Sequence, residues 1–528
     1  MAVQLNNTKR NLQRKRLNSQ GIDPRSYKVS VFTAAYNSGD LLYRSFHSLK
    51  AQTWRNWEWV VYDDSDLKDK GNTWETLKKL RDSDQRVKII KGEEHSGLIG
   101  FTKGQACSRA TGRLLAELDH DDEIAPTCLE TIVKAFKTYP DAGFAYTICS
   151  EPFEESNKFV QYIDGWGQGM GAHYYQLIEG RWMLVGNNPD IRPESFSSIV
   201  GCPNHMRVWD TKTYWKAGGH DPGLKHTDDY DLMLRTFLAS KFIKIPQPLY
   251  YQYYRHSANT TDMGDNRKEI NATWPIFYEK HNAGIADKFK AYGVDREPEN
   301  IPYWQHSDHY PAVNYLYQPN KDLISIPLPT FNRPDSLRKA IDSVFQQTYE
   351  NWELLIVGDN CSHLEGVMEE FKDPRIKWWN LSSNYGAGGA TPRNYALKML
   401  SVGNYIAYID DDMKWKSNHL SSLFEVLKSN KADYAISSMD WGPWGPLVCR
   451  EPKLYRVDTS SVLHKKLLLE KYGYWKSREE TSYAHDWELV SRWGEHPYAA
   501  TLKDSLIYNM NVPYDFNNLY NKYGDQNG

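Results

Sequence analysis

The stretch YKVSVFTAAYNSGDLLYRSFHSLKAQTWRNWEWVVYDDS, residues 27–65, decides the fold because the chain contains it twice. The second copy, DLISIPLPTFNRPDSLRKAIDSVFQQTYENWELLIVGDN, occupies residues 322–360. Each copy has the pattern of a strand, a polar turn, a helix, a short loop and a second strand. Asp64 matches Asp359, and this spacing of 295 residues (359 − 64) holds throughout the two copies. A period this long indicates two whole domains and excludes a solenoid, whose units span about 20 to 50 residues.

The composition is that of a soluble globular protein. Of the 528 residues, 40% are hydrophobic and 25% are charged, so both domains can form cores. A net charge of −3 gives the whole chain no electrostatic reason to bind nucleic acid. No apolar run reaches the roughly 18 residues of a membrane-spanning helix, and the six cysteines show no CxxC spacing. These features predict a soluble, cytoplasmic protein without a transmembrane segment.

Basic residues mark the start of the chain. Residues 1–26 contain KRNLQRKR at positions 9–16, and we predict a disordered basic tail there. The alternative is a peripheral contact between this tail and an anionic membrane or polymer.

The order of elements after each copy predicts the fold class. In the first half, a strand (87–91), a glycine-bearing loop (95–104), a helix and another strand (114–118) follow. This alternation is typical of an α/β fold with a mostly parallel sheet, where ligands bind at the carboxyl ends of the strands. We therefore predict two tandem α/β domains, 27–260 and 322–528, joined by a linker with helical segments at 261–321.

Acidic clusters follow the strand that comes after the glycine-bearing loop in both halves, at 114–118 and 405–409. One reads Asp119-His120-Asp121-Asp122 and the other Asp410-Asp411-Asp412, and each begins seven residues after a glycine. Carboxylates at a strand end are hard oxygen ligands suited to Mg²⁺ or Mn²⁺. A single DxD is a weak signal, but two at matched positions predict metal sites.

Further acids and a histidine come later in the chain. Asp229 and Asp486 lie at matched helix starts, where a carboxylate can also be a simple cap. His256 follows an aromatic strand in the first half, and residues 152–200 form an insert without clear periodicity, as functional loops often do.

Taken together, these motifs resemble family-2 glycosyltransferases of the GT-A fold. The resemblance covers most of residues 27–257 and 322–510. It rests on the first strand's end, the QT[WY]xNWE motif, the acid after the second strand, the glycine loop, the DxD and the late acidic helix start. The ordered set is specific, although no single member is.

The resemblance implies an inverting transfer of a sugar from a nucleotide-sugar donor. The expected base-binding residue, Asp64, favours UDP as the nucleotide of that donor. Residues expected to contact the nucleotide sugar are Thr33, Tyr36, Asp64, Lys103, Asp119, Thr330, Phe331, Asp359, Arg393 and Asp410. Residues expected to hold Mn²⁺ or Mg²⁺ are Asp121, Asp122, His256 and Asp412. The expected general bases are Asp229 and Asp486. The acceptor is a glycan, a lipid-linked glycan or a protein, and a modified nucleic acid stays open.

The second half departs from this pattern. It lacks the late histidine and has Met413 where the first half has Asp122. Two hypotheses follow: each domain carries one transferase activity, or the second domain only binds a donor or an acceptor. A non-catalytic carbohydrate-binding scaffold is a third. A sugar-phosphate nucleotidyltransferase is disfavoured because no glycine-rich phosphate loop with a basic residue follows the first strand of either half.

Overall fold

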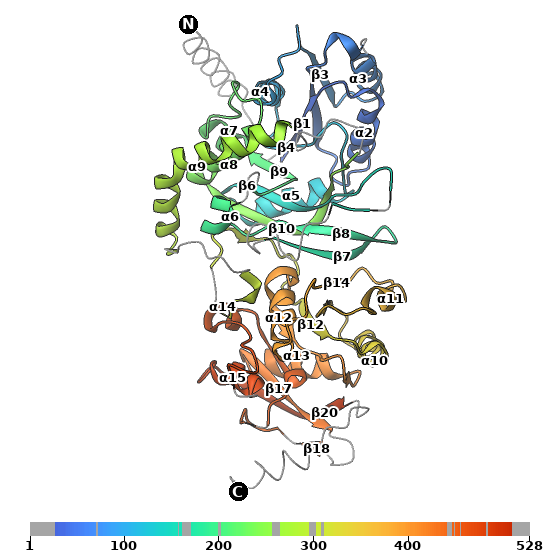
Figure 1. Ribbon diagram of the computed structural model, residues 1–528, viewed down its shortest axis with the longest axis vertical. Helices are drawn as coiled ribbons and strands as arrows, with labels where there is room; N and C mark the ends of the chain where they lie inside the picture. The colour runs from blue at the N-terminus through green and yellow to red at the C-terminus, as the bar shows by residue number, and fades with distance from the viewer. Residues whose placement is uncertain are drawn as a thin grey trace. The chain divides into compact units, whose positions relative to one another are not determined.

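The computed structural model divides the chain into two compact units (Figure 1). The described residues are 27–69, 72–156, 158–160, 171–198, 202–255, 265–294, 303–307, 311–440, 446–447, 449–454, 456–481 and 484–508. The predicted basic tail and His256 lie outside them. The first unit comprises Met1–Tyr174, Met183–Tyr303 and Tyr310–Pro319, and the second comprises Tyr175–Trp182, Trp304–His309 and Asn320–Gly528.

The first unit is built on a sheet with the strand order β3, β2, β1, β4, β9, β6, β10, β11. Strands β1 to β4 are parallel, and β9 runs antiparallel between β4 and β6. The strands of this sheet and of its edges are β1 (Val29–Ala35), β2 (Trp57–Asp63), β3 (Val87–Lys91), β4 (Leu114–Glu117), β5 (Glu123–Ile124), β6 (Ala142–Ser150), β8 (Arg181–Asn187), β9 (Arg207–Asp210), β10 (Lys241–Tyr251) and β11 (Tyr315–Leu316).

Helices cover this sheet, and α8 packs against the long α9 (Figure 1). They are α2 (Leu42–Lys50), α3 (Asn72–Ser83), α4 (Ile99–Arg109), α5 (Cys128–Thr138), α6 (Pro193–Ser198), α7 (Thr211–Lys216), α8 (Asp228–Ala239) and α9 (Asp265–Ala291). The insert at 152–200, which has no clear period in the sequence, contributes α6 and a hairpin of β7 (Ala172–Ile178) and β8.

The second unit repeats the strand order as β14, β13, β12, β15, β19, β17, β20. Its strands are β12 (Ile324–Thr330), β13 (Trp352–Gly358), β14 (Ile376–Asn380), β15 (Tyr405–Ala407), β16 (Met413–Trp415), β17 (Tyr434–Asp440), β18 (Pro446–Leu447), β19 (Val462–Lys465) and β20 (Tyr498–Tyr508). Its helices are α10 (Pro334–Phe345), α11 (Leu364–Met368), α12 (Ala390–Tyr395), α13 (His419–Ser429), α14 (Leu467–Tyr472) and α15 (His485–Ser491).

The two sheets share one hydrogen-bonding register. Val29 lies opposite Trp57 in the first sheet, and Ile324 lies opposite Trp352 in the second, both 295 residues further along. The same spacing holds to the last pair of each ladder. The predicted α/β class, with a mostly parallel sheet in each domain, is confirmed.

A buried glutamate ties the first sheet together at the end away from the acidic clusters. Glu58 accepts hydrogen bonds from the Ser30 hydroxyl at 2.5 Å and the Thr111 N–H at 2.6 Å. Lys28 and Lys88 lie 2.7 and 2.5 Å from its other oxygen. Burial opposes ionisation, but these lysines and hydrogen bonds together lower the pKa of Glu58 to about 2.

The glycine that precedes each acidic cluster is required by close backbone packing. A Cβ on Gly112 would lie 2.6 Å from the Lys28 carbonyl oxygen, and one on Gly403 would lie 2.7 Å from that of Leu323. These glycines allow β4 to pack against β1 and β15 against β12, and so place the acids that follow.

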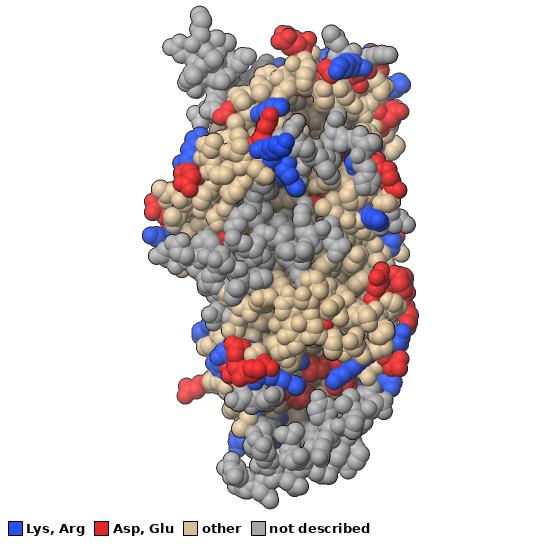
Figure 2. All heavy atoms as spheres, viewed as in Figure 1, with Lys and Arg blue, Asp and Glu red and all other residues tan. Residues whose placement is uncertain are grey.

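No helix in the described part of the chain is long and apolar enough to cross a membrane. On the face shown in Figure 2, the described acidic and basic side chains are interspersed.

We expect Glu58→Gln to destabilise the first unit in a pH-dependent way. The folded pKa of about 2 lies below the ordinary value of 4.5, so the charge stabilises the fold by about 3 kcal/mol above pH 4.5. This contribution disappears as the pH falls toward 2. Urea unfolding of the wild type and the variant should therefore differ at pH 7 and converge in acid.

The matched control is Glu130→Gln, which removes the i,i+4 pair with Lys134 on the surface. It should leave the urea midpoint at pH 7 close to that of the wild type, because exposed ion pairs contribute little to stability. Equal stability of Glu58→Gln and the wild type at pH 7 would contradict this account of the buried glutamate.

Candidate active site

An acid after the second strand of each sheet holds the loop that follows the third strand. Asp64 accepts hydrogen bonds from the N–H and the hydroxyl of Ser96 at 3.0 and 2.8 Å. Asp359 accepts the N–H groups of Tyr385 and Gly386 at 2.8 and 2.9 Å. Both acids are buried. The two predicted base-binding residues therefore occupy equivalent places and have equivalent contacts.

Tyr36 lies beside the first of these acids and Phe331 is exposed at the end of β12, whereas the two threonines point into the protein. Tyr36 stacks on His95 with ring centroids 4.7 Å apart, and Phe331 is 47% exposed. The Thr33 hydroxyl is buried and donates to the Leu118 carbonyl at 2.6 Å. Thr330 is also buried and donates to Asp411 at 2.8 Å.

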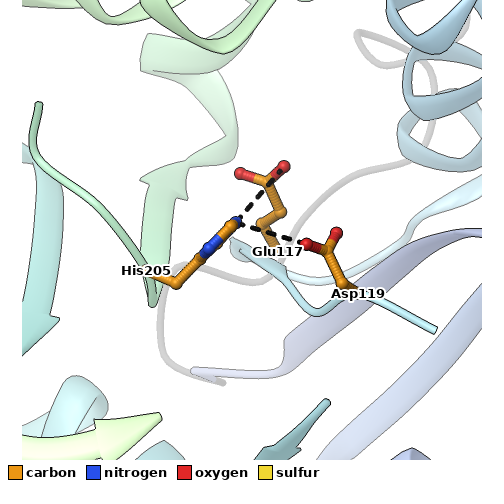
Figure 3. Close-up of side chains that lie close together, drawn as sticks. All are labelled: Glu117, Asp119 and His205. Carbon is orange, nitrogen blue, oxygen red and sulfur yellow. Dashed lines mark ion pairs between the residues drawn. The ribbon is translucent and has the colours of Figure 1, made fainter. Parts of the chain in front are cut away.

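Three potential metal ligands meet in the first unit (Figure 3). Glu117 ends β4, Asp119 follows two residues later, and His205 precedes β9. The Nε2 atom of His205 lies 3.9 Å from Glu117 Oε1 and 3.8 Å from Asp119 Oδ2. The Asp119 side chain is 37% exposed, so it can meet a ligand, whereas Glu117 is buried.

Two buried cations connect this group to the start of α8. Lys103 lies 2.6 Å from Glu117 and 3.4 Å from Asp228. Arg207 lies 3.5 Å from the other oxygen of Glu117 and 2.9 Å from Asp229. Each cation therefore bridges Glu117 and one of the two adjacent helix-start acids.

These charges separate the pKa values of the two acids. Burial raises the pKa of Asp228 to about 6 despite the nearby Lys103. Burial would also raise the pKa of Asp229, but Arg207 and Lys103 outweigh it and hold that pKa below the usual value. Asp229 is therefore ionised at neutral pH, and its side chain is 24% exposed. A partly open carboxylate of this kind can accept a proton.

The other acids of the first DxD have protein partners. Asp121 forms an ion pair with Arg255. Asp122 is buried and accepts hydrogen bonds from the Tyr250 hydroxyl at 2.7 Å and the Tyr253 N–H at 2.9 Å. Burial, together with the charges of Asp121 and Asp119, raises the pKa of Asp122 well above its usual value.

The residues of the first unit fit a divalent ion. Two carboxylates and an imidazole nitrogen are a donor set that Mn²⁺ accepts. Asp119 is open to a ligand, and within the described residues it makes no ion pair with Lys or Arg. Glu117 already forms ion pairs with Lys103 and Arg207. Asp119 and His205 are therefore the best placed ligands in the described part of this unit.

In the second unit, each acid of the triple has an arginine partner. Asp410 pairs with Arg393, whose guanidinium also donates to the Gly388 carbonyl. Arg333 lies 3.1 Å from Asp411 and 2.6 Å from Asp412.

The buried ion pairs of the first unit have no counterpart at the equivalent places of the second. The registers of β4 and β15 put Tyr408 in the place of Glu117. Those of β9 and β19 put Val462 in the place of Arg207. A carboxylate and a guanidinium are thus replaced by a phenol and an aliphatic side chain.

Asp486 consequently has different surroundings from Asp229. It accepts a hydrogen bond from Thr459, and His485 Nε2 lies 3.1 Å away. It borders a narrow cavity whose other lining residues are Tyr408, Val457, Thr459, Val462, Trp475, Leu489 and Val490.

Sequence reasoning missed Glu117, His205 and Arg207. Glu117 lies inside an apolar strand, two residues before the DxD, and alternation alone would have put it on the same side as Asp119. His205 and Arg207 are in no recognised motif. They reach the site because β9 inserts antiparallel beside β4.

Comparisons with known proteins agree with the motifs. The model of the family "Glycosyl transferase family 2" matches residues 30–211 and 325–508. An uncharacterized glycosyltransferase of Rickettsia bellii is 22% identical over 417 residues, which are 78% of this chain and 57% of the relative. The chain thus spans little more than half the length of that relative.

Two further proteins show shorter or weaker similarity. The Escherichia coli UDP-Glc:alpha-D-GlcNAc-diphosphoundecaprenol beta-1,3-glucosyltransferase WfgD is 38% identical over 119 residues, 22% of this chain and 46% of that protein. The structure of Staphylococcus aureus TarS 1-349 in complex with UDP-GlcNAc matches with a TM-score of 0.38 and 16% identity, covering 51% of this chain and 74% of that one.

The family match covers both copies of the repeat and more than half of the chain. The chain therefore belongs to glycosyl transferase family 2, with one family domain in each half.

Proposed function

We propose that the first unit is a metal-dependent, inverting glycosyltransferase. It takes a sugar from a nucleotide-sugar donor, UDP-linked by our proposal, and transfers it to a hydroxyl of a glycan or lipid-linked acceptor. The observation that carries the proposal is the joined set of Glu117, Asp119, His205, Arg207 and Asp229 at the carboxyl ends of the strands.

Asp229 is the general base in this proposal. Arg207 fixes one of its oxygens at 2.9 Å, and the Tyr230 N–H donates to the other at 2.7 Å. The acceptor oxygen forms a bond to the anomeric carbon while the bond from that carbon to the diphosphate breaks. The nucleoside diphosphate leaves with the electron pair, and Asp229 receives the acceptor proton. A single displacement of this kind inverts the anomeric centre.

Asp119 and His205 would hold the metal ion, with Glu117 beside them. A bound Mn²⁺ or Mg²⁺ would neutralise charge on the leaving diphosphate. Lys103 keeps Glu117 ionised in the buried part of the site, because it lies 2.6 Å from that carboxylate. Asp64 shapes the base pocket by holding the loop at Ser96.

The donor and acceptor classes rest on family relatives. The name of WfgD states a UDP-glucose donor and a lipid-diphosphate-linked acceptor. The same donor nucleotide is consistent with an acid and an aromatic residue, Asp64 and Tyr36, at the base pocket.

For the second unit, the contacts favour nucleotide binding over transfer. The surroundings of Asp359 match those of Asp64, which supports a nucleotide pocket. Val462 takes the place of the arginine that pairs with Asp229, and Arg393, whose charge also acts on Asp486, is paired with Asp410 instead. One transferase unit and one nucleotide-binding unit fit these contacts better than two transferase units.

Substitution of the two helix-start acids tests this assignment. We expect Asp229→Asn to lower nucleotide release from UDP-sugars by about 10² to 10⁴-fold, because the base is lost. The matched change Asp486→Asn should leave release within about twofold of the wild type, since Val462 stands where the first unit has the arginine that pairs with Asp229. Release is measured with Mn²⁺ and a panel of nucleotide sugars. Equal losses in both variants would favour two transferase sites.

Removal of the metal tests the first-unit site. EDTA should abolish nucleotide release, and added Mn²⁺ should restore it, because the charge on the diphosphate is otherwise unbalanced. Asp119→Asn should raise the Mn²⁺ concentration needed for half-maximal release, whereas Glu130→Gln on α5 should not. Release that persists in EDTA would contradict metal dependence, and no release with any donor would favour the non-catalytic scaffold.

A further inference from the structure

Each acid of the triple in the second unit already has an arginine partner. Arg393 pairs with Asp410, and Arg333 pairs with both Asp411 and Asp412. In the first unit, by contrast, the equivalent first acid, Asp119, faces the imidazole of His205. An incoming ion would have to displace an arginine from each acid of the second unit.

The first unit's other ligands are also replaced. Tyr408 stands where Glu117 stands, and the β-strand registers put Ser460 in the place of His205. The Ser460 hydroxyl accepts the Asp410 N–H at 3.3 Å. Neutral phenol and hydroxyl groups are poor ligands for a divalent metal ion compared with carboxylate and imidazole. Within the described residues, the one group of three potential ligands lies in the first unit.

The contacts of the acid after the second strand are nevertheless kept in the second unit. Asp359 holds the loop at Tyr385 and Gly386 as Asp64 holds Ser96. Phe331, at the carboxyl end of β12, is one of few large apolar side chains left exposed among the described residues. Thr330, the residue before Phe331, accepts the Asp359 N–H at 2.9 Å, so the ring and the acid follow neighbouring strand ends. An exposed aromatic ring and a carboxylate at such a place suit a nucleotide base, which stacks on the ring and donates to the acid.

The arginines that pair with the acids are the groups in this unit that can bind phosphate. The Arg393 side chain is buried, and its Nε atom has no hydrogen-bond partner among the described residues. The guanidinium is held between Asp410 and the Gly388 carbonyl, 4.9 Å from the Trp475 ring centre. The Arg333 side chain is 38% exposed. A fixed guanidinium is a strong partner for phosphate oxygens.

We propose that the second unit binds a nucleoside diphosphate without a divalent metal, with Arg393 and Arg333 as the hydrogen-bonding partners of its phosphates. The inference rests on the proposed function, because the family relationship makes a nucleotide the expected ligand. It departs from the sequence-based prediction of Asp412 as a metal ligand.

The number of Mn²⁺ ions bound by the full chain tests the metal part directly. Electron paramagnetic resonance counts free Mn²⁺ in the presence of saturating UDP, or of GDP, CDP or dTDP in parallel. One ion per chain is expected. Asp119→Asn should abolish that binding, and the matched change Asp410→Asn should keep it. Two ions per chain, or loss of an ion in Asp410→Asn, would overturn the inference.

Calorimetric titration with the same nucleotides tests the binding part. With Mn²⁺ we expect two nucleotides per chain, and with EDTA one. The EDTA-resistant site should persist in Asp64→Asn and weaken by about tenfold or more in Asp359→Asn and Arg393→Met. Failure of every nucleotide to bind in EDTA would overturn the inference, whereas failure to bind at the first unit with Mn²⁺ would count against the proposed function.

A second variant distinguishes loss of the nucleotide site from loss of the fold. Arg393→Met leaves Asp410 without its partner, which is costly for a buried pair. The double variant Arg393→Met/Asp410→Asn removes both charges and should keep the wild-type circular dichroism and melting temperature. It should still lose the EDTA-resistant nucleotide site, and retention of that site at wild-type affinity would overturn the role of Arg393.

Discussion

The buried ion pairs around Glu117 are the constraint on which the first unit depends. Lys103 comes from α4, Glu117 from β4, Arg207 from β9, and the acids Asp228 and Asp229 from α8. Charges removed from water are tolerated only when they are paired, and the loss of one partner is strongly destabilising. The pairs therefore hold four elements in a fixed relation at the carboxyl ends of the strands. They also leave Asp229 ionised and partly exposed, as a proton acceptor must be.

The second unit shows how such a site changes without loss of the fold. Replacement of a whole buried ion cluster by packed neutral groups is often neutral for stability, whereas removal of one member is not. Tyr408 and Val462 replace members on both sides of the cluster, in strands whose register is unchanged. Meanwhile the contacts of Asp359 are kept. The two halves thus agree at the acid after the second strand and differ around the acid at the helix start, where transfer is proposed for the first unit.

The fold could be predicted from the sequence because of the repeat: the strand positions and the spacing of Asp64 and Asp359 can be read from short stretches of the chain. The QT[WY]xNWE motif shared by both copies proved to be structural at both of its polar ends. Gln52 forms hydrogen bonds with Ala125 and Leu129, and Glu58 joins neighbouring strands. The sequence alone could not distinguish this structural role from a role in the site. The candidate site was harder to predict from the sequence. His205 and Arg207 contact Glu117 only because an antiparallel strand is inserted about 90 residues later in the chain, and pattern reasoning has no access to that placement.

The central claim is that the two family domains use one sheet architecture for different electrostatic tasks. The most direct measurement is a crystal structure of the full chain grown with UDP and Mn²⁺, with anomalous data collected at the manganese edge. The account predicts one anomalous peak, in contact with Asp119 and His205, and UDP phosphates beside Arg393 without a peak. A second manganese peak at Asp410 or Asp412, or a first-unit peak that touches neither Asp119 nor His205, would contradict it.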